Sequence, residues 1–230
     1  MTPKSDAALR IDFAVGPEWR VSGLLILPSA ARALYVLAHG AGAGMAHPFL
    51  ATMAAALAER GIGTLRYQFP YMEAGSRRPD SPPVAHAAIR AAVAEAAHRA
   101  PGLLLIAGGK SFGGRMTSQA QALQPLAGVK GLAFLGFPLH PPDKPGDERG
   151  DHLADVRIPM LFLQGTRDEF TELSLLEPLC RRLGQRTVLQ LVDGANHSFK
   201  VPARSGRTDA DIRAELADAL DAWTGEILGK

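Results

Sequence analysis

Short apolar runs alternate with longer, alanine-rich segments along the chain, a pattern typical of strand–helix–strand units. From the third onward the runs contain almost only apolar residues, which predicts strands covered on both faces, as in a parallel sheet. The first two alternate more between apolar and polar positions, and Gly16 and Pro17 separate them, so they predict an antiparallel hairpin at one edge. The predicted strands are 9–15, 21–27, 34–38, 63–69, 103–107, 132–137, 160–164 and 188–192.

Helical patterns fill the intervals between the later strands. In the first of them apolar residues recur at a spacing of four from Phe49, and Gly61 ends the segment. Ser81 and Pro82 open the next helix with a capping hydroxyl and a first-turn proline. The predicted helices are 48–60, 86–99 with its opening at 81–82, 112–123, 172–183 and 209–227.

These elements predict an α/β fold in which an eight-stranded, mostly parallel, twisted sheet carries helices on both faces. The 230 residues form a single predicted domain, and a chain of this mass buries roughly 70% of its unfolded surface. The irregular segment 138–150 holds four prolines and predicts a loop beside the sheet, too small for a lid domain. In such sheets ligands bind beyond the carboxyl ends of the strands, so the informative residues are expected there.

Composition excludes several classes of protein. With 25 basic and 23 acidic residues and no basic run longer than two, a nucleic-acid surface is not expected. The one cysteine, Cys180, excludes an internal disulfide, and Met1 to Arg10 lack the apolar core of a signal peptide. The longest apolar runs fall far short of the roughly 20 residues of a membrane helix. We therefore expect a soluble, cytoplasmic protein with no membrane or nucleic-acid partner.

A candidate nucleophile follows the fifth predicted strand. Gly109, Ser111 and Gly113 form a G-x-S-x-G pattern between a strand and a helix, where the serine sits on a sharp turn and side chains at the glycine positions would collide with their neighbours. The Lys110–Ser111 pair also resembles the end of a phosphate-binding loop. That motif needs glycine where Leu104 stands, so it is excluded.

An acid and a histidine follow the seventh and eighth predicted strands, in the order that a serine triad on this fold requires. A serine hydroxyl needs a base, and the base needs an orienting acid. We expect His197 to be the base and Asp168 to be the acid, with Glu169 as the alternative acid.

Two backbone amides are the expected donors to the oxyanion of a tetrahedral intermediate. One is the amide of Phe112, at the start of the helix after the nucleophile. The other is the amide of Ala41, with Gly42 as the fallback, in the small-residue loop after the third strand. The alternative is that this loop only turns the chain.

Clues to a substrate are few. Tyr71, Met72, His140 and Phe199 follow strand ends and are candidates to line a pocket, although each fits ordinary packing equally well. Arg77 and Arg78 would attract an anionic substrate or form a solvated pair, and His39 is interpreted as structural.

The segments HGAGAG at 39–44, GKSFGGR at 109–115 and FPLHPP at 137–142 resemble the α/β-hydrolase superfamily. They are most similar to the branch that contains bacterial dienelactone-hydrolase-like proteins and the testis-expressed and NSL-chromatin-complex homologues. This resemblance implies the same fold and triad chemistry over essentially the whole chain. Dienelactone hydrolases carry cysteine at the elbow, where this chain has Ser111, and Cys180 lies in a predicted helix.

The predicted function is a serine hydrolase that cleaves a carboxylic ester or related acyl bond of a small soluble substrate through an acyl-enzyme. No cofactor or metal is expected, because the histidines lack the short spacings of a zinc site. Acyl transferases and peptidases use the same Ser-His-Asp triad, so both remain alternatives within the enzyme class. A non-catalytic interaction module that retains the hydrolase fold is the alternative from another class.

Overall fold

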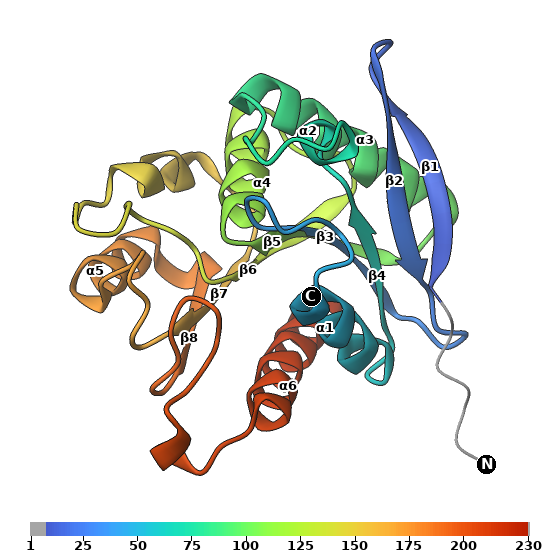
Figure 1. Ribbon diagram of the computed structural model, residues 1–230. Coiled ribbons are helices and arrows are strands. Elements are labelled where there is room, and N and C mark those ends of the chain that lie inside the picture. The colour runs from blue at the N-terminus through green and yellow to red at the C-terminus, as the bar shows by residue number, and fades with distance from the viewer. Residues whose placement is uncertain (1–7, 230) are drawn as a thin grey trace.

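A computed structural model describes residues 8–229, so the first seven residues of the segment inspected for a signal peptide lie outside the described residues. Eight strands form one sheet in the order β1-β2-β4-β3-β5-β6-β7-β8 (Figure 1). The strands are β1 (Leu9–Val15), β2 (Trp19–Ile26), β3 (Ala33–Ala38), β4 (Ile62–Tyr67), β5 (Leu104–Lys110), β6 (Val129–Leu135), β7 (Met160–Gly165) and β8 (Thr187–Val192). The helices are α1 (Pro48–Ala58), α2 (Pro70–Glu73), α3 (Pro82–Arg99), α4 (Phe112–Leu123), α5 (Leu173–Leu183) and α6 (Asp209–Leu228), with 3₁₀ helices η1 (Glu148–Asp155), η2 (Gly184–Arg186) and η3 (Ala203–Ser205).

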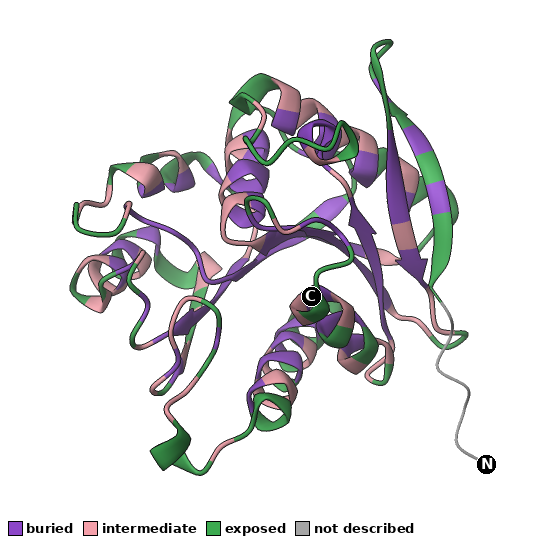
Figure 2. Ribbon diagram, viewed as in Figure 1, coloured by how far each residue is buried: buried purple, intermediate pink, exposed green. Residues whose placement is uncertain are grey.

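The predicted mixed topology is confirmed. β1 pairs with β2 in an antiparallel hairpin, β2 pairs antiparallel with β4, and the remaining neighbours are parallel. Burial alternates along β1, where only one face is covered, whereas every residue of β3 is buried (Figure 2). This difference explains why the first run of the sequence alternates in polarity and the third does not.

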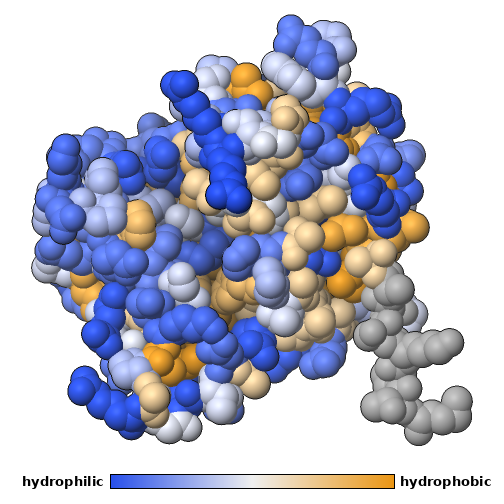
Figure 3. All heavy atoms as spheres, viewed as in Figure 1, coloured by the Kyte–Doolittle hydropathy of each residue, from blue (hydrophilic) through white to orange (hydrophobic). Residues whose placement is uncertain are grey.

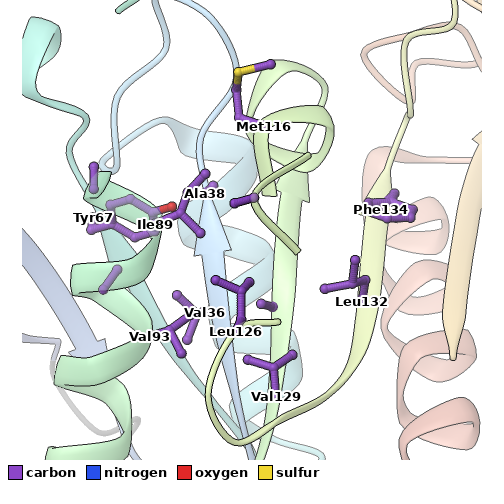
Figure 4. Packing of buried hydrophobic residues seen from close by; sticks show 14 of the residues in the cluster. Val36, Ala38, Tyr67, Ile89, Val93, Met116, Leu126, Val129, Leu132 and Phe134 are labelled. Carbon is purple, nitrogen blue, oxygen red and sulfur yellow. The ribbon is translucent and has the colours of Figure 1, made fainter. Parts of the chain in front are cut away.

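Helices cover both faces of the sheet. α3, α4 and α5 pack on one face, and α1 and α6 pack on the other (Figure 1). Figure 4 shows the first layer, in which Ile89 of α3 lies beside Tyr67 and Val93 of α3 lies beside Val36, and Met116 of α4 belongs to the same cluster. Alternate residues of β3 point to opposite layers, so the strand must be apolar at each position.

Several strand ends near the sheet's carboxyl edge differ from the prediction, and β6, for example, ends at Leu135 rather than at residue 137. The fourth strand ends at Tyr67 rather than at residue 69, and the short helix α2 follows because Pro70 suits a first helical turn. The fifth strand continues beyond residue 107 through Gly108 and Gly109 to Lys110. Glycine usually weakens a strand, but a Cβ at Gly108 would lie 1.9 Å from the Ala133 carbonyl oxygen, so the neighbouring strand leaves no room for a side chain.

Residues 138–147 form a loop, whereas residues 148–150 of the predicted loop belong to η1, and no separate lid domain is present among residues 8–229. Hydrophilic residues prevail over the β7–β8 end of the face shown in Figure 3, and apolar residues gather toward the β1–β2 end. No helix in the described part of the chain combines the length and apolarity needed to cross a membrane.

Candidate active site

Ser111 stands on a strained turn between β5 and α4. Its backbone has φ 50° and ψ −116°, a conformation that non-glycine residues rarely adopt. The turn is packed against the end of β3: a Cβ at Gly109 would lie 2.3 Å from the Ala38 carbonyl oxygen, and one at Gly113 would lie 2.6 Å from the His39 carbonyl oxygen. Both glycines of the motif are therefore required by close backbone approach.

The loop after β8 brings His197 to this serine. The distance from His197 Nε2 to Ser111 Oγ is 2.8 Å, although the two residues are 86 positions apart. The Asn196 side-chain oxygen accepts hydrogen bonds from the amides of Ser198 and Lys200, each at 3.0 Å. These bonds hold the loop in a tight turn, which fixes the direction of the imidazole.

Asp168 accepts a hydrogen bond from the other imidazole nitrogen of His197. Its Oδ2 lies 2.7 Å from His197 Nδ1, and its Oδ1 accepts from the Phe170 amide at 2.8 Å. The Asp168 side chain is 0% exposed. Glu169 is exposed and reaches only the His197 backbone amide, at 3.5 Å. The structure therefore joins Asp168, and not Glu169, to the imidazole ring.

Gln164 supports this carboxylate and was not singled out from the sequence. Its side-chain Nε2 donates to Asp168 Oδ2 at 2.6 Å, and its Oε1 accepts from the Phe137 amide at 2.9 Å. The residue is fully buried at the end of β7. The sequence did contain a signal for this residue, because Gln164 is a polar residue at the end of an otherwise apolar predicted strand.

The loops that carry the acid and the histidine are tied to each other. The Arg167 amide donates to the Ala195 carbonyl at 2.9 Å, and the Gly194 amide donates to Thr166 Oγ1 at 2.8 Å. A Cβ at Gly165 would lie 2.3 Å from the Ala195 oxygen. The two loops thus form one packed unit beside Ser111.

The loop after β3 lies against the serine turn. An added Cβ at Gly40 would be 3.8 Å from Ser111 Cβ. Among residues 8–229, the amides of Ala41 and Phe112 donate to no protein acceptor. The Gly42 amide donates to the Tyr71 hydroxyl at 3.0 Å, so it is not free as the fallback donor that the sequence indicated.

His39 anchors this loop from below. Its Nδ1 donates to the Gly40 carbonyl at 2.7 Å, and its Nε2 accepts from the Phe69 amide at 3.2 Å. Burial lowers the pKa of His39 to about 4, so the ring stays neutral near pH 7 and can accept that hydrogen bond. This placement agrees with the structural interpretation of His39.

A cavity of about 320 Å³ opens at Ser111. Small residues of the 40–43 loop form one wall, and Phe49, Leu50 and Phe170 provide apolar surface. The Phe170 ring lies 4.3 Å from the His197 ring, centroid to centroid. None of the described residues that line this cavity is acidic.

The prediction of the pocket residues is wrong, because none of the four candidates lines the cavity at Ser111. Tyr71 is held beneath the loop by its bond to Gly42, and Met72 packs under Gly44. His140 is buried, donates to the Pro141 carbonyl and accepts from the Glu172 amide, so it ties the proline-rich loop to the start of α5.

Phe199 is 3% exposed and stacks on Phe49 with ring centroids 5.6 Å apart. It lines a second cavity of about 340 Å³, which shares His47, Phe49 and Ser198 with the first. Arg77 and Arg78 are exposed and line neither cavity.

A family model described as an alpha/beta hydrolase domain matches residues 31–225. The chain belongs to the α/β hydrolases. Its fold is similar to that of a dienelactone hydrolase from Anabaena variabilis, with a TM-score of 0.78, 20% identity, and coverage of 96% of this chain and 98% of that one.

Two further proteins of known structure have a similar fold. A serine hydrolase without a lid from Xanthomonas campestris has a TM-score of 0.72 and 21% identity, with 94% of this chain and 95% of that one covered. Est1E from Butyrivibrio proteoclasticus has a TM-score of 0.70 and 17% identity, with coverage of 97% and 100%.

Proposed function

We propose that this α/β hydrolase is a serine esterase that cleaves a carboxylic ester, or a related acyl bond, of a small substrate. The observation that supports the proposal is the continuous chain of contacts from Ser111 Oγ through His197 to the buried carboxylate of Asp168, at 2.8 Å and 2.7 Å. Ser111 and His197 line one cavity, and the buried carboxylate of Asp168 lies behind the imidazole, which is the arrangement that acyl transfer requires.

In the proposed reaction His197 takes the hydroxyl proton as Ser111 attacks the substrate carbonyl. Asp168 accepts a hydrogen bond from Nδ1, which leaves Nε2 as the basic nitrogen and stabilises the imidazolium. His197 then returns the proton to the leaving group. Water activated by the same imidazole hydrolyses the acyl-enzyme and restores Ser111.

The amides of Phe112 and Ala41 are the proposed donors to the oxyanion. The Phe112 amide opens helix α4, where the helix dipole favours negative charge. The Ala41 amide belongs to the loop that packs against the serine turn. Since neither donates to a protein acceptor within residues 8–229, both remain available to a developing oxyanion.

The shape of the cavity favours a small acyl group. Its volume of about 320 Å³ lies at the low end of the range for ligand pockets, roughly 300–1,000 Å³. The small residues Gly40, Ala41 and Ala43 let the backbone of their loop approach a substrate closely. Phe49 and Phe170 contribute apolar contacts. We propose short acyl esters as the first substrates to test.

Hydrolysis of p-nitrophenyl acetate and butyrate tests this function. We expect turnover by the wild type and loss of turnover in Ser111→Ala, while Ser174→Ala, which removes an exposed hydroxyl on α5, behaves as the wild type. A fluorophosphonate probe should label Ser111 in the wild type and Ser174→Ala but not in Ser111→Ala. A folded wild type that resists the probe and cleaves no ester would favour the non-catalytic interaction module.

A further inference from the structure

Lys110 lies directly before the proposed nucleophile, yet the mechanism above gives its amine no role. It is the last residue of β5, and its side chain passes Gly40, where an added Cβ would be 3.6 Å from Lys110 Cγ. Its Nζ is buried and has no hydrogen-bond partner among residues 8–229. The amine lies over the ring of Phe199, with 5.5 Å between Nζ and the ring centroid.

The Lys110 amine and the His197 ring occupy the space over one glycine. A Cβ at Gly136 would lie 3.0 Å from Lys110 Nζ and 3.5 Å from both Cε1 and Nδ1 of His197. Gly136 follows β6, the strand next to β5 (Figure 1), and has φ +70°. The absence of a side chain there leaves the amine and the imidazole as close neighbours.

Three other charged or titratable groups face this amine. Asp168 and Glu169, on the loop after β7, favour its charged form, and His197 lies on the loop after β8. Burial is the stronger influence and lowers the pKa of Lys110 to about 8, so the amine is mainly an ammonium at pH 7. A buried charge without a partner costs stability, and retaining one beside a reactive group is typical of a functional site.

The sign of the effect on the histidine follows from charge alone. The Asp168 carboxylate, which accepts a hydrogen bond from Nδ1, stabilises the imidazolium form of the ring. A neighbouring ammonium disfavours that form. The two influences oppose each other at one ring, and the low-dielectric surroundings make each stronger than it would be in water.

We propose that Lys110 is a positioning residue for His197: its ammonium, held beside the imidazole, opposes protonation of the ring and so keeps the base free to accept the Ser111 proton in mildly acidic solution. This proposal rests on the proposed function for its benefit to catalysis. The electrostatic relationship itself can be tested without any substrate.

The test compares wild type with Lys110→Met, which keeps a side chain of similar length and removes the charge. Titration of the His197 ring by NMR, with the signal assigned by its loss in His197→Asn, should show a pKa about one unit higher in Lys110→Met. Lys130→Met removes an exposed charge at the far end of β6 and should leave this pKa unchanged. The difference should persist at high salt, because buried charges are poorly screened.

Activity provides a second, separate readout. If the protein cleaves p-nitrophenyl esters, the acid limb of the kcat/KM profile should move to higher pH in Lys110→Met by the same amount as the NMR titration, and Lys110→Arg should restore the wild-type limb. If no ester is cleaved, the proposed function fails. The NMR titration of His197 still tests the proposed role of Lys110, because it requires no substrate.

An unchanged His197 pKa in folded Lys110→Met would overturn the proposal. Should that variant fail to fold, the wild type alone suffices: the His197 signal should show a second inflection at the pH where the ¹³Cε signal of Lys110 reports loss of its proton. A His197 curve without that inflection would equally overturn it.

Discussion

The carboxamide of Gln164 donates to the same oxygen of Asp168 that accepts the imidazole, at 2.6 Å. Its other end accepts from the Phe137 amide, so both ends of a fully buried side chain are used. Gln164 thereby fixes the carboxylate plane relative to the sheet. The carboxylate of Asp168, the proposed orienting acid, is therefore held by the core and not by solvent.

Replacing Gln164 should weaken both the fold and the reaction. Gln164→Leu leaves the Phe137 amide without its acceptor and removes one donor from Asp168. We expect the free energy of unfolding to fall by about 1–3 kcal/mol. Ester turnover should fall through kcat with KM nearly constant, because the substrate does not contact this residue. Urea unfolding and steady-state kinetics check the two effects, and a change confined to KM would contradict the assignment.

Asp168 and Glu169 are neighbours in sequence and should differ sharply in effect. Asp168→Asn should reduce kcat by about 10³- to 10⁴-fold, because the imidazole loses its orienting charge and its tautomer. Glu169→Gln should change kcat by less than a few fold, since Glu169 contacts only a backbone amide. Kinetics of the matched pair decide between them, and the reverse ranking would make Glu169 the acid.

Removing the Tyr71 hydroxyl should loosen the oxyanion loop. In Tyr71→Phe the Gly42 amide loses its acceptor, and the neighbouring Ala41 amide loses a fixed direction. Because one oxyanion donor accounts for about 10²- to 10³-fold in turnover, a misdirected one should reduce kcat by about 10-fold. Tyr35→Phe, which also removes a buried hydroxyl bond but far from the loop, should affect stability and leave kcat intact. Equal kcat losses in the two variants would indicate a general effect.

Two helical glycines offer opposite outcomes for the same substitution. Gly113→Ala places a Cβ 2.6 Å from the His39 carbonyl oxygen and should lower the free energy of unfolding by about 1–3 kcal/mol through overpacking, with loss of activity. Gly225→Ala in α6 meets no atom within 4 Å and should raise it by about 1 kcal/mol. Thermal unfolding of both variants checks this contrast. A stable, active Gly113→Ala protein would show that the elbow relaxes more than its geometry indicates.

The buried amine of Lys110 predicts a rise in stability at alkaline pH. Its pKa of about 8 in the folded protein lies below its ordinary value of 10.5, so the unfolded chain binds more protons between these pH values. The free energy of unfolding contributed by this group should therefore rise by about 3 kcal/mol from pH 8 to pH 10.5. Urea unfolding of wild type and Lys110→Met should show the variant more stable near pH 7.5, with the gap closing as pH rises. A gap independent of pH would exclude the ionisation as its cause.

Much of the fold and the placement of Ser111, Asp168 and His197 could be predicted because they depend on local rules. Apolar runs mark strands covered on both faces, and the carboxyl ends of neighbouring parallel strands meet at one edge. The contacts of Ser111 with His197, and of His197 with Asp168, follow from that rule together with the chain order.

Other features depend on contacts between segments and left little trace in the sequence. The length of β5 is set by how closely Ala133 approaches Gly108, which no pattern in β5 alone reveals. Tyr71 follows a strand end, as a pocket residue would. Its hydroxyl instead accepts a hydrogen bond from the Gly42 amide, which holds it beneath the loop. The groups around Lys110 follow the strands β3, β6, β7 and β8, so the sequence next to Lys110 pointed only to a phosphate-binding loop, which was excluded.

Because the loops after β7 and β8 pack against each other, the site consists of two structural units: this pair of loops and the turn that carries Ser111. The backbone hydrogen bond between Arg167 and Ala195 holds the loops of Asp168 and His197, the proposed acid and base, in fixed relation to each other. A chimaera that takes 165–200 intact from a relative would carry both proposed residues together and would need only to place one imidazole against Ser111. A crossover inside that stretch, for example within α5, would instead separate partners that must be exchanged together.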